Sequence, residues 1–291
     1  MTVPGMTEPN RFGTVIDKQY EIQQLIGTGG MASVYKARHK DSGTLYAVKI
    51  LHPAEMTPTD IERLRREARA LNSLVHPNIL KCHAFGMLDS GEPYIILDLL
   101  EGMSLDQKIQ SEGPQPSEWM VRAFRQICKG LAAAHEKGMI HRDLKPSNIM
   151  VVKEEADGSF VKLLDFGIVR SLNASKDDVK LTRSGEIFGS PLYMSPETIQ
   201  GKEIDERADI YALGCLMYES LTAAPPFLGG TVLATFMKHL QDKVKPMTQI
   251  LPELIVSIQL EKVIYKCMQK DPANRYQTVL EVLEALEGCE D

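Results

Sequence analysis

Eight consecutive residues near the middle of the chain bring an acid, a base and an amide close together: His141-Arg142-Asp143-Leu144-Lys145-Pro146-Ser147-Asn148. They follow a segment with helical spacing and precede one with strand character, and loops in such positions commonly carry chemistry. Asp143 could accept or orient the proton of an attacking hydroxyl group. Lys145 could offset charge on a phosphoryl group in transfer, and Asn148 could present an oxygen to Mg²⁺. The segment therefore predicts an active-site loop for phosphoryl transfer.

A second candidate metal ligand is Asp165, in Asp165-Phe166-Gly167, because its carboxylate is the hard oxygen donor that Mg²⁺ prefers. Any one of these residues could be no more than a polar residue of a turn. Matching six specified positions of the octapeptide by chance, in a chain of 291 residues, has a probability on the order of one in a hundred thousand. In-line phosphoryl transfer relies on positioning and charge neutralisation, so the members of the set need one another.

A glycine-rich stretch precedes these residues, with Gly27, Gly29 and Gly30 around Thr28. Glycines let a backbone approach a polyphosphate closely and point its N–H groups at it. The run Gly27 to Ala32 also fits the dinucleotide-binding fingerprint, but that motif opens a helix, whereas a second strand is predicted here. A tight hairpin tip without a ligand is the other interpretation of this stretch alone.

Lys49 lies in a predicted strand, Ala47-Val48-Lys49-Ile50, and could be an ordinary solvated lysine. Glu67 lies on the flank of the inward face of a predicted helix, where a carboxylate favours a cationic partner. An ion pair between Lys49 and Glu67 would hold the ammonium group where it can neutralise phosphate oxygens. An exposed glutamate is the alternative for Glu67.

The elements that must position these residues change in character along the chain. The first hundred residues read as strands with one helix, and the chain beyond residue 113 reads as mainly helical with two short strands. A Thr59-x-x-Glu62 capping box predicts the start of the first helix, and Gly138 predicts the end of the second. The predicted strands cover 20–26, 34–35, 45–50, 79–85, 94–100, 149–153 and 160–164, and the predicted helices cover 59–75, 117–137 and parts of the chain after 196.

Composition limits the function classes. A net charge of −6 removes the electrostatic footprint of a nucleic-acid-binding protein, so no nucleic-acid partner is expected. The five cysteines are odd in number and never spaced as C-x-x-C, which indicates a reducing compartment and neither a zinc site nor a disulfide framework. No signal sequence or membrane-length apolar stretch is recognised, so a cytoplasmic location is expected, either alone or as the cytoplasmic domain of a longer membrane-bound protein.

The motifs occur in the order of a known family, and the chain over residues 20–286 resembles a eukaryotic-like (Hanks-type) protein kinase. The Gly-Gly-Met form of the glycine-rich loop is similar to that of bacterial serine/threonine kinases. The resemblance implies an α+β, two-lobed fold, with a β-rich N-lobe over 16–98, a mainly helical C-lobe over 99–286 and a tail over 287–291. Residues 1–15 read as a flexible lead-in, because they carry Pro4, Gly5, Pro9 and Gly13 and little apolar pattern. The matching positions are Gly27 to Val34, Ala47 to Lys49, Glu67, His141 to Asn148, Asp165 to Gly167, Ser195 to Glu197, Asp209 and Arg275.

The same resemblance assigns roles residue by residue. Asp143 would be the catalytic base, assisted by Lys145, Lys49 and Glu67, and Asn148 with Asp165 would hold Mg²⁺, with Mn²⁺ as an alternative. Glu197 with Arg275 would form a buried ion pair, and Asp209 would brace the backbone of the catalytic loop. ATP would contact the loop residues Gly27, Thr28, Gly29 and Gly30, the phosphate-binding Lys49, the apolar residues Ile26, Val34, Ala47 and Met150, and the backbone of Asp98 and Leu100. The apolar four could equally be plain core.

Further details of the resemblance concern substrate and control. Lys145 and Ser147 follow the serine/threonine form of the catalytic loop. Arg142 matches kinases whose activation segment is ordered by phosphorylation, which makes Thr182 and Ser184 candidate autophosphorylation sites. An unmodified polar loop is the alternative.

The expected function is transfer of the γ-phosphate of ATP to serine or threonine hydroxyls of protein substrates, with a homodimer as a candidate arrangement for autophosphorylation. A pseudokinase scaffold is the rival from another class, and a small-molecule kinase of similar fold is the second rival. Lys49, Asp143 and Asp165 are all present, which argues against the scaffold.

Overall fold

Strand-forming residues near the start of the chain and long amphipathic helices later in it produce two structural units. The computed structural model describes residues 11–30, 32–52, 58–153, 160–166 and 191–289. The described residues up to Ser73 form the first unit together with Lys81–Leu100, and Leu74–Leu80 join the described residues from Glu101 onward in the second. The first unit is mainly sheet and the second mainly helix, which confirms the α+β class. The lobe limits 16–98 and 99–286 stay predictions.

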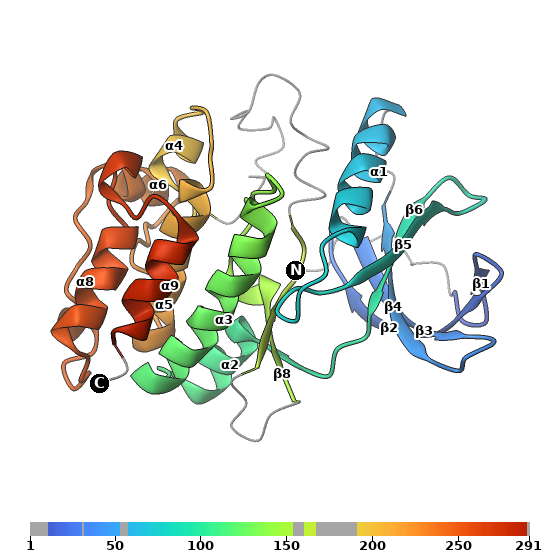
Figure 1. Cartoon of the computed structure of the whole chain (residues 1–291), viewed down its shortest axis with the longest axis horizontal. Coiled ribbons are helices and arrows are strands. Elements are labelled where there is room, and N and C mark those ends of the chain that lie inside the picture. The colour runs from blue at the N-terminus through green and yellow to red at the C-terminus, as the bar shows by residue number, and fades with distance from the viewer. Residues whose placement is uncertain (1–10, 31, 53–57, 154–159, 167–190, 290–291) are drawn as a thin grey trace. The chain divides into compact units, whose positions relative to one another are not determined.

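The first unit contains a six-stranded sheet with the order β1-β2-β3-β4-β6-β5, in which all neighbouring strands are antiparallel (Figure 1). The predicted hairpin is confirmed, because the glycine-rich stretch joins β2 to β3. The strands are β1 (Val15–Ile16), β2 (Tyr20–Thr28), β3 (Ala32–His39), β4 (Leu45–Leu51), β5 (Cys82–Met87) and β6 (Pro93–Asp98).

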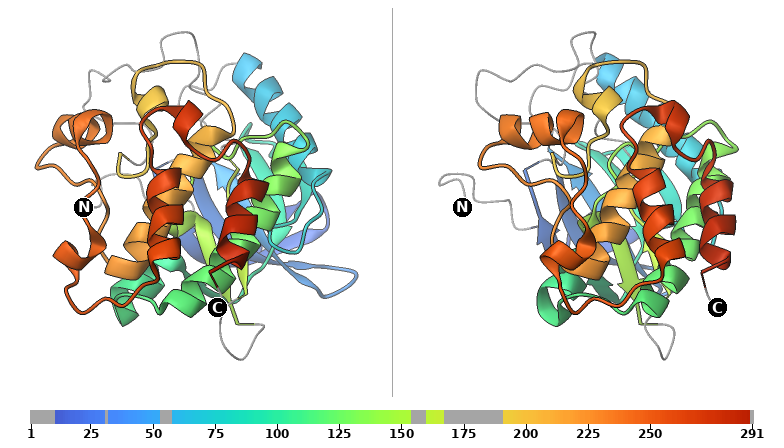
Figure 2. Two further views of the ribbon diagram at one scale, coloured as in Figure 1. Left: turned by 60° about the vertical axis from the view of Figure 1, so that its left-hand side comes forward. Right: turned by 90° about the vertical axis from the view of Figure 1, so that its left-hand side faces the viewer.

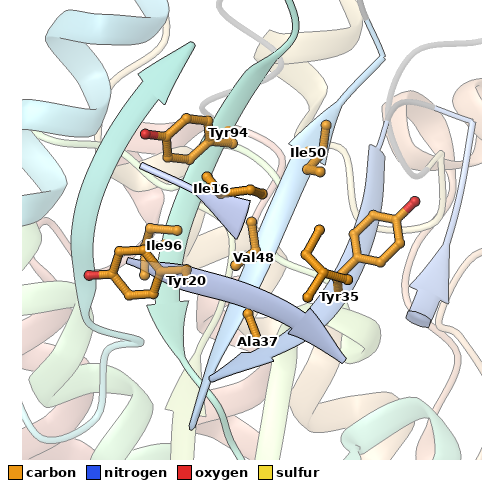
Figure 3. Close-up of a cluster of buried hydrophobic side chains, with 9 residues drawn as sticks. Ile16, Tyr20, Tyr35, Ala37, Val48, Ile50, Tyr94 and Ile96 are labelled. Atoms are coloured by element: carbon orange, nitrogen blue, oxygen red, sulfur yellow. The ribbon is translucent and has the colours of Figure 1, made fainter. Parts of the chain in front are cut away.

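One face of this sheet carries a buried apolar cluster (Figure 3). Val48 of β4 lies opposite Tyr35 of β3 and Ile96 of β6, so the three side chains share this face. Val48 and Ile96 have no exposed surface, and burying each contributes roughly 1.5–3 kcal/mol. Because side chains alternate across a strand, Lys49 and the other odd-numbered residues of β4 lie on the opposite face of the sheet from this cluster.

Helix α1 (Pro58–Asn72) lies beside β5 (Figure 1). Leu64, Ala68 and Leu71 form its buried face, as the helical spacing predicts. The predicted cap at Thr59 is wrong, because the helix already includes Pro58 and Thr59 therefore lies in its first turn. The predicted end at residue 75 is also wrong: Val75 lies beyond the helix and is 76% exposed.

The second unit contains a three-stranded antiparallel sheet of β7 (Gly102–Ser104), β8 (Ile149–Val152) and β9 (Val161–Leu163), in the order β7-β8-β9. An isolated parallel bridge joins Ile79 to Leu163, and the N–H of Leu80 donates to the carbonyl of Leu163 at 2.9 Å. These bonds explain why 74–80 belong to the second unit and why the strand predicted from residue 79 starts only at Cys82.

Helices make up most of the second unit (Figure 2). Helix α5 is buried along nearly all of its length and packs against α8, while α3 packs against α9. Gly138, whose φ of 69° favours glycine, follows α3 as predicted, but the helix ends at His135, two residues before the predicted end at 137. The helices are α2 (Leu105–Glu112), α3 (Ser117–His135), α4 (Pro196–Ile199), α5 (Arg207–Thr222), α6 (Val232–Gln241), α7 (Met247–Ile250), α8 (Ile258–Cys267) and α9 (Val279–Glu287), with short 3₁₀ turns at Pro146–Asn148 and Pro272–Asn274. Among the described residues, no helix is both long and apolar enough to cross a membrane.

Candidate active site

The backbone at the start of the loop 141–148 is held by one buried carboxylate of α5. Asp209, which is 1% exposed, accepts the N–H of His141 at 2.8 Å and the N–H of Arg142 at 3.0 Å. His135 at the end of α3 donates to the same carboxylate at 2.9 Å. Arg142 has a φ of 63°, a left-handed conformation that costs a non-glycine residue roughly 1–2 kcal/mol. The bonds to Asp209 offset this strain, which agrees with the bracing role expected for Asp209.

His141 links the loop to the segment that carries Asp165. Its Nε2 donates to the carbonyl of Leu164 at 2.8 Å, and its ring centroid lies 4.6 Å from that of Phe166. Since a carbonyl only accepts, Nε2 carries the proton and Nδ1 can accept the N–H of Asp143, at 3.4 Å. Burial of the ring lowers the pKa of His141, although nearby carboxylates act in the opposite direction. The residue is therefore a neutral structural link.

The carboxylate of Asp143 is held by two neighbours in the loop. The Lys145 ammonium lies 2.8 Å from Asp143 Oδ2, and the Asn148 side-chain amide donates to the same oxygen at 3.1 Å and to the Asp143 carbonyl at 2.8 Å. Because both of these oxygens only accept, the amide nitrogen of Asn148 must face Asp143. The amide oxygen of Asn148 is then the atom that can bind a cation.

The two predicted metal ligands are linked through the backbone. Leu164 donates its N–H to the carbonyl of Asn148 at 2.9 Å, and Asp165 follows directly. Asp165 has a φ of 42°, a further left-handed position in this small region. An amide oxygen and a carboxylate are hard donors, and Mg²⁺ typically takes one or two such ligands together with water and phosphate oxygens. No group of three or more His, Cys, Asp or Glu side chains that could hold a metal occurs in the described part of the chain. The donor set fits Mg²⁺ arriving with a nucleotide.

In the first unit, the glycine-rich stretch forms the turn between β2 and β3. The N–H of Gly29 donates to the carbonyl of Ala32 at 2.9 Å. A Cβ atom added at Gly27 or Gly30 would meet no heavy atom of the described residues within 4 Å, and neither glycine has a positive φ. The fold therefore does not need glycine at these positions. This is the pattern expected where a backbone is kept clear for a ligand.

The predicted pair Lys49 and Glu67 lies in the same unit on two different elements. Lys49 is half-buried on β4, opposite Val34 and Ile95, and Glu67 is half-buried on α1. Their ion pair stays a prediction.

The residues predicted to contact adenine are divided between the units. Ile26 is 46% exposed, so it is not plain core, whereas Ala47 is buried and Val34 is half-buried. Met150 lies on β8 in the second unit and is also half-buried. The adenine contacts of all four stay predictions.

Asp98 at the end of β6 donates its N–H to the carbonyl of Lys81 at 3.1 Å. A bond from its backbone to a nucleotide would therefore come from its carbonyl. The Asp98 carboxylate is held by His83 Nε2 at 2.6 Å. Leu100 lies two residues beyond β6 and is half-buried.

The candidate phosphorylation sites Thr182 and Ser184 lie outside the described residues.

The predicted ion pair of Glu197 and Arg275 is confirmed. Two parallel bonds of 2.7 Å join the guanidinium to the carboxylate, and both residues are almost fully buried. Arg275 also donates to the carbonyls of Arg207, Gln269 and Lys270 at 2.7–3.0 Å. Burial acts to raise the pKa of Glu197, but the hydrogen bonds and charge of Arg275 outweigh it, so that pKa lies below its ordinary value.

These motifs and this fold agree with a comparison against known families. The family described as "Protein kinase domain" matches residues 20–286 of the chain. The chain belongs to the protein kinase family. The two-lobed kinase fold predicted from the motifs is thereby confirmed.

Bacterial serine/threonine-protein kinases are among the relatives of this kinase chain. Serine/threonine-protein kinase pkn3 of Myxococcus xanthus is 36% identical over 264 residues, which cover 90% of this chain and 48% of the relative. Serine/threonine-protein kinase PknB of Mycobacterium leprae is 34% identical over 276 residues, which cover 92% of this chain and 42% of the relative. The chain therefore spans about half, or less, of the length of these relatives.

Solved kinase structures show the same fold. Rad53 residues 1–466, crystallised with AMP-PNP, superimposes with a TM-score of 0.77 at 28% identity over 92% of this chain and 65% of that one. The kinase domain of Mycobacterium tuberculosis PknI gives a TM-score of 0.72 at 24% identity over 97% of this chain and 99% of the other.

Sequence reasoning missed three polar side chains next to the predicted ones. His135 shares the carboxylate of Asp209, and a signal for it exists, because it lies in the last turn of the predicted helix 117–137, six residues before His141. Ser33 of β3 and His52, which directly follows β4, contact the glycine-rich turn, and residues this far apart along the chain leave no pattern in the sequence.

Proposed function

We propose that the chain is a protein serine/threonine kinase, which transfers the γ-phosphate of ATP to serine or threonine hydroxyl groups of protein substrates. The observation that carries the proposal is the restrained carboxylate of Asp143, held by Lys145 at 2.8 Å and by Asn148 at 3.1 Å. A carboxylate fixed in this way can orient a hydroxyl nucleophile without reorganisation during the reaction.

In this mechanism Asp143 accepts the hydroxyl proton of the protein substrate as the oxygen attacks the γ-phosphorus atom. Lys145 offsets negative charge on the transferring phosphoryl group, and the bond to the ADP leaving group breaks in line with the attack. Asn148 and Asp165 would hold Mg²⁺, or Mn²⁺ as an alternative, and the ion when bound neutralises charge on the phosphate oxygens. Their link through Leu164 supports a shared task.

The nucleotide is proposed to bind through the first unit as well. The open space around Gly27 and Gly30 suits close approach of phosphates, with Lys49 supplying positive charge. Exposed Ile26 supplies an apolar surface for adenine. The complex of Rad53 with AMP-PNP supports an adenine nucleotide as the ligand.

Two further properties are proposed from the family resemblance, and a third from the cysteines. Thr182 or Ser184 is autophosphorylated, and a homodimer serves that reaction. The chain works in the cytoplasm, a reducing compartment, because all five cysteines lie among the described residues and none forms a disulfide.

The experiment that tests the proposal uses γ-labelled ATP, Mg²⁺ and a generic protein substrate, followed by hydrolysis and identification of the labelled amino acids. We expect phosphoserine and phosphothreonine. Label that appears only on a panel of small-molecule alcohols would support a small-molecule kinase, and nucleotide binding without any transfer would support a pseudokinase scaffold. Phosphotyrosine alone would also contradict the proposal. Peptide mapping of the kinase itself tests Thr182 and Ser184.

A further inference from the structure

A hydrogen-bonded group of four residues surrounds the glycine-rich turn of the first unit. His52 directly follows β4, and its Nε2 lies 2.9 Å from the hydroxyl of Ser33 on β3. Its Nδ1 lies 3.3 Å from the carbonyl of Gly30. The Ser33 hydroxyl also lies 3.3 Å from the hydroxyl of Thr28, the last residue of β2. The imidazole ring thus connects the end of one strand to both sides of the turn.

The chemistry of the partners gives these bonds a direction. The carbonyl of Gly30 only accepts, so His52 Nδ1 carries a proton. In the neutral ring Nε2 then accepts from the hydroxyl of Ser33, and the Ser33 oxygen can accept from Thr28. Ser33 is 2% exposed, so its bond to His52 forms away from bulk water, and losing it would cost free energy. His52 therefore stabilises two groups at once.

The turn needs such support because its glycines carry no side chains that could pack. A glycine segment samples many backbone conformations, and ordering it on ligand binding costs free energy that a pre-ordered segment avoids. Register pairing of Ala32 with Leu51 brings the turn close to His52. The bond to the Gly30 carbonyl restrains the backbone of the turn directly.

We propose that His52 and Ser33 are positioning residues, which hold the glycine-rich turn in the conformation that receives the phosphates of ATP. The inference rests on the proposed function, since it assigns the turn to ATP. Neither residue touches the nucleotide in this account. Their effect is on ATP affinity, and the chemical step at Asp143 is unaffected.

The test compares His52→Ala, His52→Gln, His52→Asn and Ser33→Ala with the wild type. Loss of one or two hydrogen bonds of ordinary strength changes an equilibrium by about three- to tenfold. His52→Ala is expected to raise the KM for ATP by about that factor and to leave kcat within about twofold. The Gln variant keeps a group near Ser33 and the Asn variant keeps one near Gly30, so both should give smaller increases. Amide hydrogen exchange of the turn should accelerate most in His52→Ala and less in the Gln and Asn variants.

His39→Ala is the matched control, since His39 lies at the opposite end of β3 and bonds to Gln19 and Ser42. It should leave the KM for ATP and the exchange of the turn unchanged. Circular dichroism checks that each variant folds. If His52→Ala does not fold, the Gln and Asn variants still test the inference.

Failure of the proposed function and failure of the inference about His52 give different results. A wild-type protein that transfers no phosphate contradicts the proposed function, while hydrogen exchange in the turn still tests the role of His52. An active wild type whose KM for ATP and turn exchange are the same in all His52 variants overturns the inference. Equal losses of kcat without a change in KM would also overturn it.

Discussion

Asn148 donates its side-chain amide to two oxygens of Asp143, the backbone carbonyl at 2.8 Å and the carboxylate Oδ2 at 3.1 Å. The residue is 6% exposed, so these bonds form away from bulk water. One side chain therefore has two tasks: its nitrogen restrains the proposed base, and its oxygen is turned to where a cation could bind. Changes at Asn148 should separate these tasks.

The first prediction concerns Asn148→Asp and Asn148→Ala. The aspartate keeps an oxygen for Mg²⁺ but replaces the donor to Asp143 with a like charge, whereas alanine removes both the donor and the oxygen. We expect kcat to fall by about a hundredfold or more in both. Only the alanine variant should need a markedly higher Mg²⁺ concentration for half-maximal rate. Steady-state kinetics over a Mg²⁺ series measures this, and a wild-type kcat in either variant would contradict the assignment.

The second prediction concerns Asp209→Asn. An amide can accept only one of the two backbone N–H groups, because its nitrogen is a donor. Leaving one buried N–H without an acceptor should cost about 1–3 kcal/mol of unfolding free energy and should also lower kcat, since His141 and Arg142 lose their anchor. Denaturant unfolding and kinetics give the two values. Asp205→Asn, near the start of the same helix and more exposed, is the control, and equal effects of the two substitutions would remove the special role of Asp209.

The chemistry of the loop was predictable because it is carried by short-range sequence. Asp143, Lys145 and Asn148 lie within six residues, so one short loop can bring them together once Asp209 holds its backbone. The sheet and the main helices were also predictable, because alternation and helical spacing report directly on burial, as for Leu64 and Ala68 in α1.

Two kinds of feature could not be predicted: the start of a helix, and contacts between residues distant in sequence. Threonine is a common N-cap residue, which favours Thr59 as the cap. The helix nevertheless includes Pro58, because proline is well tolerated in a first helical turn. Ile79 reads as part of a strand of the first sheet, but its bridge to Leu163 places it in the other unit. The link between His52 and Gly30 joins residues 22 positions apart and has no sequence signature.

The third prediction concerns the ion pair of Arg275 with Glu197. Arg275→Met leaves a buried carboxylate and three carbonyls without their donor, which should cost about 3–5 kcal/mol of unfolding free energy. Arg275→Lys cannot reproduce the two parallel bonds and should recover only part of that loss. Urea denaturation measures both. A loss below about 1 kcal/mol in Arg275→Met would show that the pair contributes little.

The fourth prediction concerns pH and the buried His239 of α6, whose Nδ1 lies 2.9 Å from the hydroxyl of Tyr211. Burial, reinforced by the charge of Lys270, lowers the pKa of His239 to about 3. The unfolded chain takes up a proton near the ordinary pKa of 6.5, and the folded chain does not until about pH 3. His239 therefore lowers the free energy of unfolding as pH falls below 6.5, by at most about 1.4 kcal/mol per pH unit.

His239→Asn removes this titration and should flatten the dependence of unfolding free energy on pH between 5 and about 6.5. Urea titrations at several pH values in that window compare the two proteins. The same slope for both would contradict a neutral His239. His141 has its pKa lowered by burial in the same direction and should account for part of the slope that remains.

The central claim is that Asp143 acts as the base for phosphoryl transfer, and the most direct measurement is single-turnover transfer from ATP to a protein substrate by wild type and Asp143→Asn. Asp89→Asn, in the exposed turn after β5, is the matched control. Asp143→Asn is expected to slow transfer by about a thousandfold while ATP affinity and folding stay unchanged, and Asp89→Asn is expected to keep the wild-type rate. Transfer by Asp143→Asn at the wild-type rate would contradict the role of Asp143 as the base.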